Sequence, residues 1–364
     1  MRVVITGGGT GGHCTPAIAV AEALRAADPA GTVTYVGRVD GPEARIVPAA
    51  GLPFHGLELS GGGDGRWWGL ESVRRAARLP LAYRQALGLL RVLVPDVVVA
   101  TGGYVCVPVA VAARRRGVPL VVLEQNVHPG RAVRWLAPWA AAVATSFAET
   151  AGELGRATVT CTGNPVRSAV VRGGVGLTAP TAPHRVLVMG GSQGAHRLNT
   201  ALAAALPTLL PARPALTVTH LSGPRDHGEL VRQRQQLPPA ERERWVVEPF
   251  VVDVAARIAA SDLVVMRAGG SSLAEVTTMG RPMILVPYPY AGAHQRRNAA
   301  PYVAAGAAVT IPDEACTGPR LAAEISALLD DPPRWRRMAE ASQRCGRPDA
   351  AAAVVRLVAA VASR

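Results

Sequence analysis

Two glycine-rich stretches have the composition of phosphate-binding turns. "TGGGTGGHCTP" follows the apolar run 2–6, and "GGSQGAHRLN" follows the apolar run 185–189. Each run begins with an arginine, and each turn precedes a helix-forming segment. Glycine lets the main chain approach a ligand closely, and the N–H groups at a helix start attract anions. The repeat therefore predicts two strand–turn–helix units that each receive part of a phosphorylated ligand.

The first turn alone leaves two interpretations open. It is not a clean G-x-G-x-x-G that continues to an acidic residue at the end of the second strand, because that strand ends "YVGRVDGPE". A dinucleotide site is the competing interpretation. His13 at the exit of the turn is either a general base facing a cleft or a capping and packing residue.

A third stretch, 267–299, concentrates polar residues after two further apolar runs. Gly269 to Ser272 predict a turn and a helix N-cap, and Glu275 is expected in about the first turn of the following helix. Such a carboxylate complements the helix dipole or accepts the two hydroxyls of a ribose. The cluster 294–298 is either a solvated surface or a clamp for sugar hydroxyls.

The elements that position these residues are buried strands alternating with helices, a pattern typical of doubly wound parallel α/β sheets. Strand-like runs cover 2–6, 32–37, 96–101, 119–126, 141–146 and 157–165, then 185–190, 216–223, 244–250, 262–269, 282–289 and 307–312. Helical patterns include 16–28 and 74–93. We expect an N-terminal Rossmann-like domain over 1–170, a linker over 171–184, a C-terminal Rossmann-like domain over 185–340 and a helical tail over 341–364 that packs back on the first domain. Ligands bind at the carboxyl ends of such strands, so the two turns are expected to face each other across a cleft.

Composition narrows the class of protein. The 364 residues include 39 arginines, no lysine and a formal net charge of +13, which favours an anionic partner: nucleic acid, a phosphorylated substrate or an acidic membrane surface. The 5 cysteines are scattered without CxxC spacing, so we expect neither disulfides nor a zinc site. The chain enters a strand at residue 2, so no signal peptide is expected, and no apolar run reaches the roughly 18 residues that cross a bilayer.

The segment 65–93 mixes aromatic and aliphatic residues with arginines. Its candidate membrane-docking residues are Trp67, Trp68, Arg74, Arg75 and Arg78, and "GRAVRWLAPW" at 130–139 extends the pattern. The competing interpretation is an amphipathic helix packed on its own sheet with solvated arginines.

Six motifs, in order along nearly the whole chain, together resemble the MurG family of glycosyltransferases. They are "GGGTGGHCTPAIAVAEAL", "TGGYVCVPVAVAA", "EQNVHPG", "GNPVR", "GGSQGAHRLN" and the 267–299 run. The resemblance implies a GT-B fold of two Rossmann-like domains, and transfer of GlcNAc from UDP-GlcNAc to the MurNAc 4-hydroxyl of lipid I, which forms lipid II. It further implies inversion at the anomeric carbon, no cofactor and no protein-bound metal. The expected location is the cytoplasmic face of the inner (plasma) membrane, as a peripheral protein with no nucleic-acid partner.

Site residues follow from the same resemblance, position by position. Those implied to bind UDP-GlcNAc are Thr10, Gly11, Gly12, Asn126, Arg167, Ser192, Val251, Gly270, Ser271, Ser272, Leu273, Ala274, Glu275 and Gln295. Glu275 matches the family's ribose-binding glutamate, and Gln295 a glutamine that reads the GlcNAc hydroxyls. His294 stands where the family commonly has a second glutamine. His13 and Glu124 are the two candidates for the general base.

Two other functions remain compatible with the sequence. One is a GT-B glycosyltransferase with a different lipid or natural-product acceptor. The other is a nicotinamide-dependent dehydrogenase or a nucleotide-binding module without chemistry. The imperfect dinucleotide fingerprint and the presence of two similar turns argue against the latter.

Overall fold

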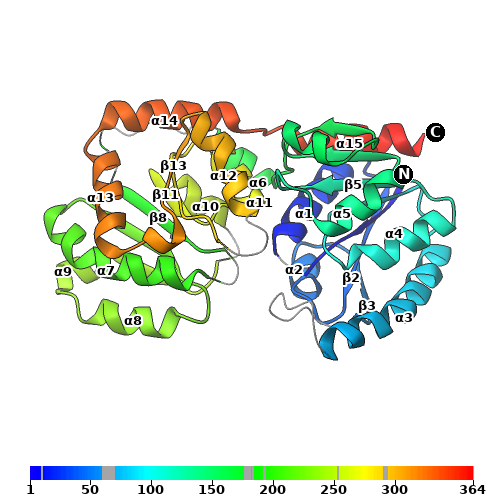
Figure 1. Ribbon diagram of the computed structural model, residues 1–364, viewed down its shortest axis with the longest axis horizontal. Helices are drawn as coiled ribbons and strands as arrows, with labels where there is room; N and C mark the ends of the chain where they lie inside the picture. Colours follow the sequence, from blue (N-terminus) through cyan, green and yellow to red (C-terminus); the bar gives the residue numbers. More distant parts are fainter. Residues whose placement is uncertain are drawn as a thin grey trace. The chain divides into compact units, whose positions relative to one another are not determined.

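The chain divides into two units of α/β structure (Figure 1). The computed structural model describes residues 1–9, 11–59, 70–175, 182, 184–191, 194–251, 254–289 and 294–363, and the side chains of 70–77 also lie outside the description. The first unit is Met1–Ser168 with Arg347–Arg364, and the second is Ala169–Gly346. Each unit is described by itself, so the expectation that they face each other across a cleft stays a prediction.

The first unit is built on a parallel seven-stranded sheet in the order β3-β2-β1-β4-β5-β6-β7. Its strands are β1 (Arg2–Thr6), β2 (Thr32–Arg38), β3 (Phe54–Leu57), β4 (Val97–Ala100), β5 (Leu120–Glu124), β6 (Ala142–Thr145) and β7 (Val159–Cys161). Its helices are α1 (Gly11–Ala27), α2 (Glu43–Ala49), α3 (Leu70–Leu93), α4 (Cys106–Arg115), α5 (Arg131–Leu136) and α15 (Ala350–Ala362), with 3-10 turns η1 (Ala137–Trp139) and η2 (Ala148–Glu153).

The second unit repeats this plan with a parallel six-stranded sheet in the order β10-β9-β8-β11-β12-β13. Its strands are β8 (Arg185–Met189), β9 (Thr217–Leu221), β10 (Trp245–Glu248), β11 (Leu263–Met266), β12 (Met283–Leu285) and β13 (Ala308–Thr310). Its helices are α7 (His196–Ala212), α8 (His227–Gln235), α9 (Pro239–Arg242), α10 (Val254–Ala259), α11 (Gly270–Thr278), α12 (His294–Ala304), α13 (Gly318–Leu329) and α14 (Pro332–Cys345), with a 3-10 turn η3 (Asp313–Ala315). Helix α6 (Ser168–Gly174) lies where the first unit ends and the second begins.

Apolar runs without alternation form these strands because both faces of each sheet are covered. Side chains along a strand point to opposite faces in turn. In β4, Val98 and Ala100 pack with residues of α3 and α4, whereas Val97 and Val99 pack with residues of α1 and α15. The expected doubly wound α/β class, with two Rossmann-like sheets, is therefore confirmed.

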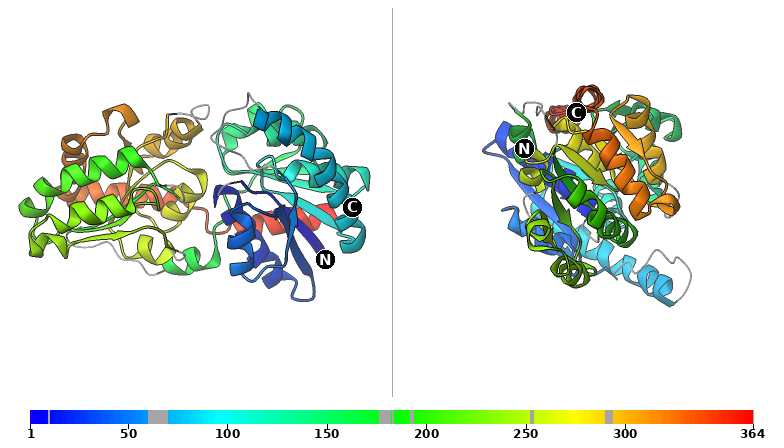
Figure 2. Two further views of the ribbon diagram at one scale, coloured as in Figure 1. Left: turned by 90° about the horizontal axis from the view of Figure 1, so that it is seen from below. Right: turned by 90° about the vertical axis from the view of Figure 1, so that its left-hand side faces the viewer.

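Helix α15 belongs to the core of the first unit although it follows the whole second unit in sequence. Val354, Val358 and Val361 are buried in the same cluster as Ala17 and Val20 of α1. Figure 2 shows α15, in red, running beside the blue segments of that unit. The turn between α14 and α15 contains Gly346 to Pro348.

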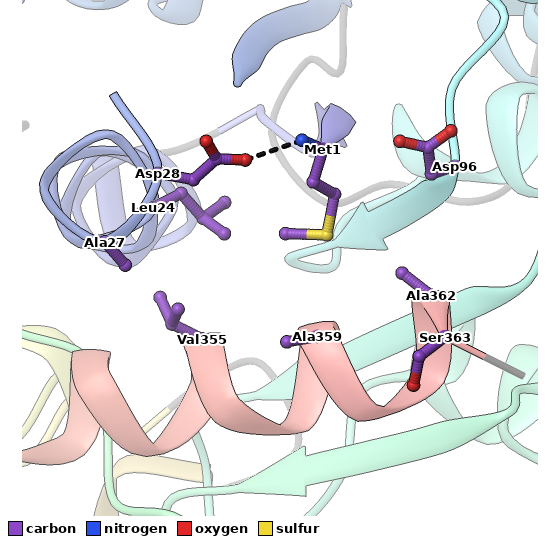
Figure 3. Close-up of a pocket in the computed structure, with 9 residues that line it drawn as sticks. All are labelled: Met1, Leu24, Ala27, Asp28, Asp96, Val355, Ala359, Ala362 and Ser363. Carbon is purple, nitrogen blue, oxygen red and sulfur yellow. Dashed lines mark hydrogen bonds and ion pairs between the residues drawn. The ribbon is translucent and has the colours of Figure 1, made fainter. Parts of the chain in front are cut away.

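A pocket of 380 Å³ lies between α1, α15 and the start of β1 (Figure 3). Its lining is mostly apolar, and the Met1 ammonium pairs with Asp28 at 2.5 Å. Met1 and Asp96 precede β1 and β4 directly, so the pocket lies at the amino ends of the strands. Ligands of parallel α/β sheets bind at the opposite ends, so this pocket is separate from the candidate site.

Three local expectations need correction. The edge strand β3, "FHGL", was not expected, because it has no apolar run of the kind that marks buried strands. Residues 171–174 of the expected linker are the second half of α6. The expected tail beginning at 341 starts inside α14, which continues to Cys345.

Among the described residues, no helix is both long and apolar enough to cross a membrane.

Candidate functional site

The two glycine turns occupy equivalent places in the two sheets. β1 lies between β2 and β4, and β8 lies between β9 and β11. In both sheets the chain leaves this central strand for one neighbour and later returns to the other side, which opens a crevice at the carboxyl ends of the strands. The turns after β1 and β4 therefore form a candidate site in the first unit, and those after β8 and β11 form another in the second.

In the first unit, the turns after β1 and β4 pack directly against each other. Gly8 and Gly9 have φ of 145° and 85°, and Gly102 and Gly103 have φ of 99° and 75°. A Cβ added at Gly103 would lie 2.4 Å from the carbonyl oxygen of Gly8. Only glycine allows both these dihedral angles and this close approach.

His13 in the first turn of α1 lies against both glycine turns. Its Nδ1 is 3.1 Å from the carbonyl oxygen of Gly8. Because a carbonyl only accepts hydrogen bonds, Nδ1 carries the proton and the lone pair is on Nε2. A Cβ added at Gly102 would lie 3.2 Å from Nε2. Burial lowers the pKa of His13 below its ordinary value of 6.5, with the hydrogen bond to Gly8 opposing the shift. The imidazole is therefore neutral near pH 7, the state that a general base needs.

Glu124, the other candidate base, is 3% exposed, and both of its carboxyl oxygens accept hydrogen bonds from other groups of the protein. Its Oε1 accepts hydrogen bonds from the main-chain N–H of Asn126 at 2.8 Å and the Nδ2 of Asn126 at 2.9 Å. Its Oε2 accepts from the N–H of Gly130 at 2.7 Å. Burial raises the pKa of the Glu124 carboxyl, although these N–H donors act against the shift. The contacts favour a role for Glu124 in holding Asn126 rather than in removing a proton from substrate.

Gln125 connects the turns after β4 and β5. Its Nε2 donates to the carbonyl oxygen of Thr101 at 3.1 Å, and the side chain is 4% exposed. Thr150 donates from Oγ1 to the carbonyl oxygen of Asn126 at 3.2 Å. The segment 124–126 is thus fixed beside the turn that contacts His13.

In the second unit, α11 begins within the sequence "GGSS". The N-cap is Gly269, with φ −75° and ψ 135° and no side-chain cap, and Gly270 is the first helical residue. The N–H groups of Gly270, Ser271 and Ser272 are therefore at the positive end of the helix dipole, where anions bind. Loop residues Ser192 and Thr10, expected to contribute in the same way, lie outside the described residues.

Glu275 lies in the second turn of α11, which corrects the expected first-turn position. The first turn contains no acidic residue, so Glu275 does not serve to complement the helix dipole there. The side chain is 5% exposed. Leu273 is buried beside it, whereas Ala274 is half-buried.

Gln295 and Asn298 of α12 connect the loops that follow β11 and β12. Oε1 of Gln295 accepts from the N–H of Ala268 at 3.1 Å and from the N–H of Tyr288 at 2.9 Å. Nδ2 of Asn298 donates to the carbonyl oxygen of Ala268 at 3.2 Å. Since the Gln295 carbonyl is occupied by two main-chain donors, its amide N–H groups are what it can offer to a sugar hydroxyl.

A buried ion pair supports the same loops. Nη1 of Arg267 lies 2.5 Å from Oδ1 of Asp313 and donates to the carbonyl oxygen of Val286 at 2.9 Å. The two side chains are 9% and 11% exposed. The guanidinium also lies 5.5 Å from the ring centroid of Tyr288. Sequence reasoning did not single out Arg267, although it starts the 267–299 run.

The remaining expected donor-site residues are distributed over both units. Gly11 and Gly12 begin α1, and Asn126 follows β5. Arg167 lies in the segment between β7 and α6, and Val251 follows β10; both are half-buried. In the described part of the first unit, His13 and Gln125 both contact the turn after β4, and in that of the second, Gln295 contacts Ala268 just before α11.

Glu43 is the main residue that sequence reasoning missed. It begins α2 and is 0% exposed, with its carboxylate under the Gly7–Gly9 turn. The available signal was the "DGPE" sequence after β2, considered only as a departure from a dinucleotide fingerprint. Asp40 of the same sequence lies 2.6 Å from the Arg38 guanidinium.

The expected membrane-docking residues lie on or before α3. Trp67 and Trp68 are outside the described residues, as are the side chains of Arg74 and Arg75, whereas Arg78 is exposed. Farther along α3, Leu79 and Leu81 are 38% and 44% exposed.

Within the described part of the chain, no group of three or more His, Cys, Asp or Glu side chains could hold a metal ion.

Comparison with known proteins identifies the family. Residues 3–145 match the family model of the "Glycosyltransferase family 28 N-terminal domain". Residues 185–354 match the model of the "Glycosyltransferase family 28 C-terminal domain". A UDP-N-acetylglucosamine--N-acetylmuramyl-(pentapeptide) pyrophosphoryl-undecaprenol N-acetylglucosamine transferase of Halothermothrix orenii is 37% identical, over 98% of both chains. A transferase of the same name from an Anaeromyxobacter species is 41% identical, over 100% of this chain and 94% of the relative. The crystal structure of Acinetobacter baumannii MurG superimposes with a TM-score of 0.73 at 25% identity, covering 99% of each chain. The chain therefore belongs to glycosyltransferase family 28 and, within it, to the MurG family.

Proposed function

We propose that this protein transfers GlcNAc from UDP-GlcNAc to the 4-hydroxyl of MurNAc in lipid I, with inversion, and so forms lipid II. The observation that carries the proposal is the full-length similarity to transferases whose names specify this donor and acceptor, at 35% to 41% identity. The geometry of the two sites supports it, because one offers a neutral base and the other offers a site for a diphosphate.

His13 acts as the general base. Its Nε2 takes the proton of the acceptor hydroxyl while that oxygen attacks the anomeric carbon of GlcNAc. The hydrogen bond from Nδ1 to the Gly8 carbonyl maintains the required tautomer and stabilises the imidazolium as it forms. The bond between the anomeric carbon and the β-phosphate oxygen breaks in the same displacement, and UDP leaves with its new negative charge.

The second unit stabilises that charge. The N–H groups at the start of α11 are aligned by the helix and need no reorganisation as the diphosphate departs. Glu275 accepts the ribose hydroxyls, and the Gln295 amide donates to hydroxyls of the sugar. His13 belongs to the first unit, whereas Glu275 and Gln295 belong to the second.

A dehydrogenase is disfavoured by the contacts of Glu43. In a dinucleotide fold an acidic residue after the second strand accepts ribose hydroxyls. Here the Glu43 carboxylate accepts main-chain N–H groups and is 0% exposed. A glycosyltransferase with another acceptor remains the second candidate, since the donor residues would be the same.

The decisive experiment is an assay with UDP-GlcNAc and a soluble lipid I analogue, beside a lipid acceptor without the MurNAc-pentapeptide. We expect transfer to the lipid I analogue alone, with the β-configured product that inversion of the α-linked donor gives. Transfer only to the second acceptor would replace lipid I in the proposal, and absence of GlcNAc transfer to either would overturn it.

We further propose that the first unit docks on an anionic membrane surface through α3, α4 and α5. α4 packs against both other helices. Trp135 is 55% exposed and contacts Trp139 edge to face at 5.7 Å between centroids, and the Arg114 guanidinium lies 5.0 Å from the Trp139 ring. Arg131 and Arg134 are exposed on α5. Aromatic side chains bordered by arginines suit an interface with acidic lipid headgroups.

Co-sedimentation with vesicles tests this surface. We expect binding to vesicles of phosphatidylglycerol and phosphatidylcholine that weakens as salt is added, and little binding to phosphatidylcholine alone. Trp135→Ala combined with Arg134→Ala should reduce binding several-fold, whereas Arg232→Ala on α8 of the second unit serves as the charge-matched control. Equal loss with both variants would remove α5 from the docking surface.

A further inference from the structure

The buried carboxylate of Glu43 is enclosed by glycines from three segments. A Cβ added at Gly8 or at Gly41 would lie 2.4 Å from this carboxyl group, and one added at Gly37 would lie 2.7 Å from its Cγ. Gly41 and Gly37 have no positive φ, so their backbone conformation alone does not require glycine. These positions instead leave the space that a carboxylate occupies beneath the first glycine turn.

Both oxygens of this carboxylate accept main-chain hydrogen bonds. Oε2 accepts from the N–H of Gly9 at 3.1 Å, and Oε1 accepts from the N–H of Arg38 at 3.0 Å. One carboxylate therefore ties the turn after β1 to the end of β2. The Tyr35 hydroxyl adds a further tie by donating to the Gly7 carbonyl at 3.1 Å.

The tied turn is the one that orients His13. The Gly8–Gly9 peptide supplies the Gly8 carbonyl to Nδ1 of His13 and the Gly9 N–H to Glu43. These two groups belong to the same planar peptide unit, so fixing one fixes the direction of the other. A catalytic group displaced by about 1 Å can lose about 100-fold in rate.

We infer that Glu43 is a positioning residue for the reaction: it holds the Gly8–Gly9 peptide so that the Gly8 carbonyl keeps His13 in the Nδ1–H tautomer. The inference rests on the proposed role of His13 as base. It assigns Glu43 no contact with substrate, and it predicts that every effect of Glu43 on turnover passes through His13.

Glu43→Gln is the first test, because glutamine keeps the size of the side chain. One of its two terminal positions becomes an NH2 group, which cannot accept from the N–H that faces it. We expect kcat to fall about 10- to 100-fold, with a smaller change in KM for UDP-GlcNAc, because Glu275 and Gln295 belong to the other unit and no expected donor residue is replaced. Asp96→Asn is the matched control: Asp96 also accepts a main-chain N–H, from Arg2 at 2.7 Å, but at the opposite end of the sheet.

A double variant separates positioning from a general structural effect. In the His13→Ala background, Glu43→Gln should change the residual kcat by less than about twofold, since no imidazole remains to be oriented. A similar fall of kcat with and without His13 would overturn the inference.

Nitrogen-15 NMR of the His13 ring gives a readout that does not depend on the reaction. The His13 signals are identified by their absence from His13→Ala. Wild type should show the Nδ1–H tautomer, and Glu43→Gln should show a mixture of both tautomers. If His13→Ala kept full turnover, His13 would not be the general base of the proposed function. The tautomer measurement would still test whether Glu43 orients the His13 ring. An unchanged tautomer in Glu43→Gln would overturn the inference.

Gly41→Ala provides a second route should Glu43→Gln fail to fold. The added methyl group displaces the Glu43 carboxyl group but does not change its chemistry. We expect a smaller fall of kcat with the same direction of tautomer change, whereas wild-type kcat with a wild-type tautomer would count against the positioning role.

Discussion

The two glycine turns end in histidines at matching positions that have opposite surroundings. His13 follows Gly7 by six residues, and His196 follows Gly190 by six residues. His13 lies inside α1 with Nδ1 on a main-chain carbonyl, whereas His196 begins α7 with an 82% exposed side chain whose Nδ1 lies 3.1 Å from Asp226. Two similar glycine turns thus precede a half-buried, neutral imidazole in one unit and an exposed imidazole in the other.

This difference follows from the residues that contact each turn. In the first unit, Glu43 lies against Gly8, and Gly102 and Gly103 of the turn after β4 lie against the His13 ring. In the second, Gly194 approaches the carbonyl of Ser222, Asn199 donates to that carbonyl at 2.7 Å, and the His196 side chain is exposed. A motif therefore indicates where a main chain will turn, but its neighbours decide what its side chains can do.

Replacing each histidine by alanine should give the largest contrast. His13→Ala should lower kcat about 100- to 10,000-fold, the usual contribution of a general base. His196→Ala should change it less than about threefold. The measurement is steady-state transfer from UDP-GlcNAc to a lipid I analogue. Comparable losses in both variants would mean that the shared motif, rather than its surroundings, determines the chemistry.

Glu275→Ala should affect the donor and leave the base intact. Loss of the hydrogen bonds that we propose it accepts from ribose should raise the Kd for UDP-GlcNAc about 10- to 100-fold, since hydrogen bonds to charged groups contribute about 1.5–3 kcal/mol. Calorimetric titration measures this, and His13→Ala should bind the donor as wild type does. The exposed Glu243→Ala is the control. Unchanged donor affinity in Glu275→Ala would remove Glu275 from the site.

Each unit also has an aspartate that accepts main-chain N–H groups at the amino ends of its strands, and the two aspartates differ in burial. Asp96 accepts from the N–H of Arg2 in a partly exposed pair, whereas Asp262 is 0% exposed and accepts from the N–H groups of His184 and Arg185. Burial would raise the pKa of Asp262, but Arg185 and these N–H donors hold it below its ordinary value of 3.8.

Asp262→Asn should therefore lower the free energy of unfolding by about 1–3 kcal/mol, and Asp96→Asn by less than about 1 kcal/mol. The stabilisation by Asp262 is present above pH 3.8 and is lost as pH falls through its lower folded pKa. Urea unfolding at pH 7 and again below pH 4 measures both effects. An equal cost for the two substitutions at pH 7 would show that burial does not distinguish the two aspartates.

The smallest effect concerns pH. Because burial lowers the pKa of His13, the acid limb of the kcat/KM profile should lie below pH 6.5, with activity falling only once the imidazole becomes protonated. The limb should be absent from the residual activity of His13→Ala. A limb above pH 6.5 would contradict the lowered pKa of His13.

The fold was largely predictable because its signals are local. Apolar runs such as "VVVA" and "LVVM" identify strands buried on both faces, and the arginine that begins β1 and β8 marked the repeat. The site was predictable only in part. Glu124 and Gln295 were identified as candidate site residues, but their hydrogen bonds were not predicted. Their oxygens accept main-chain N–H groups of loops whose positions residue spacing does not reveal. Glu43 was missed for the same reason, since its role depends on glycines from three separate segments.

Helix α15 has a consequence for how the protein is made. Its valines complete a hydrophobic core whose other buried members precede residue 145, so in a nascent chain α1 covers that face of the first sheet without α15 until the entire second unit has emerged. Domains usually fold in order of synthesis. Here the second unit is synthesised in full before α15, so it can complete its core before the first unit does.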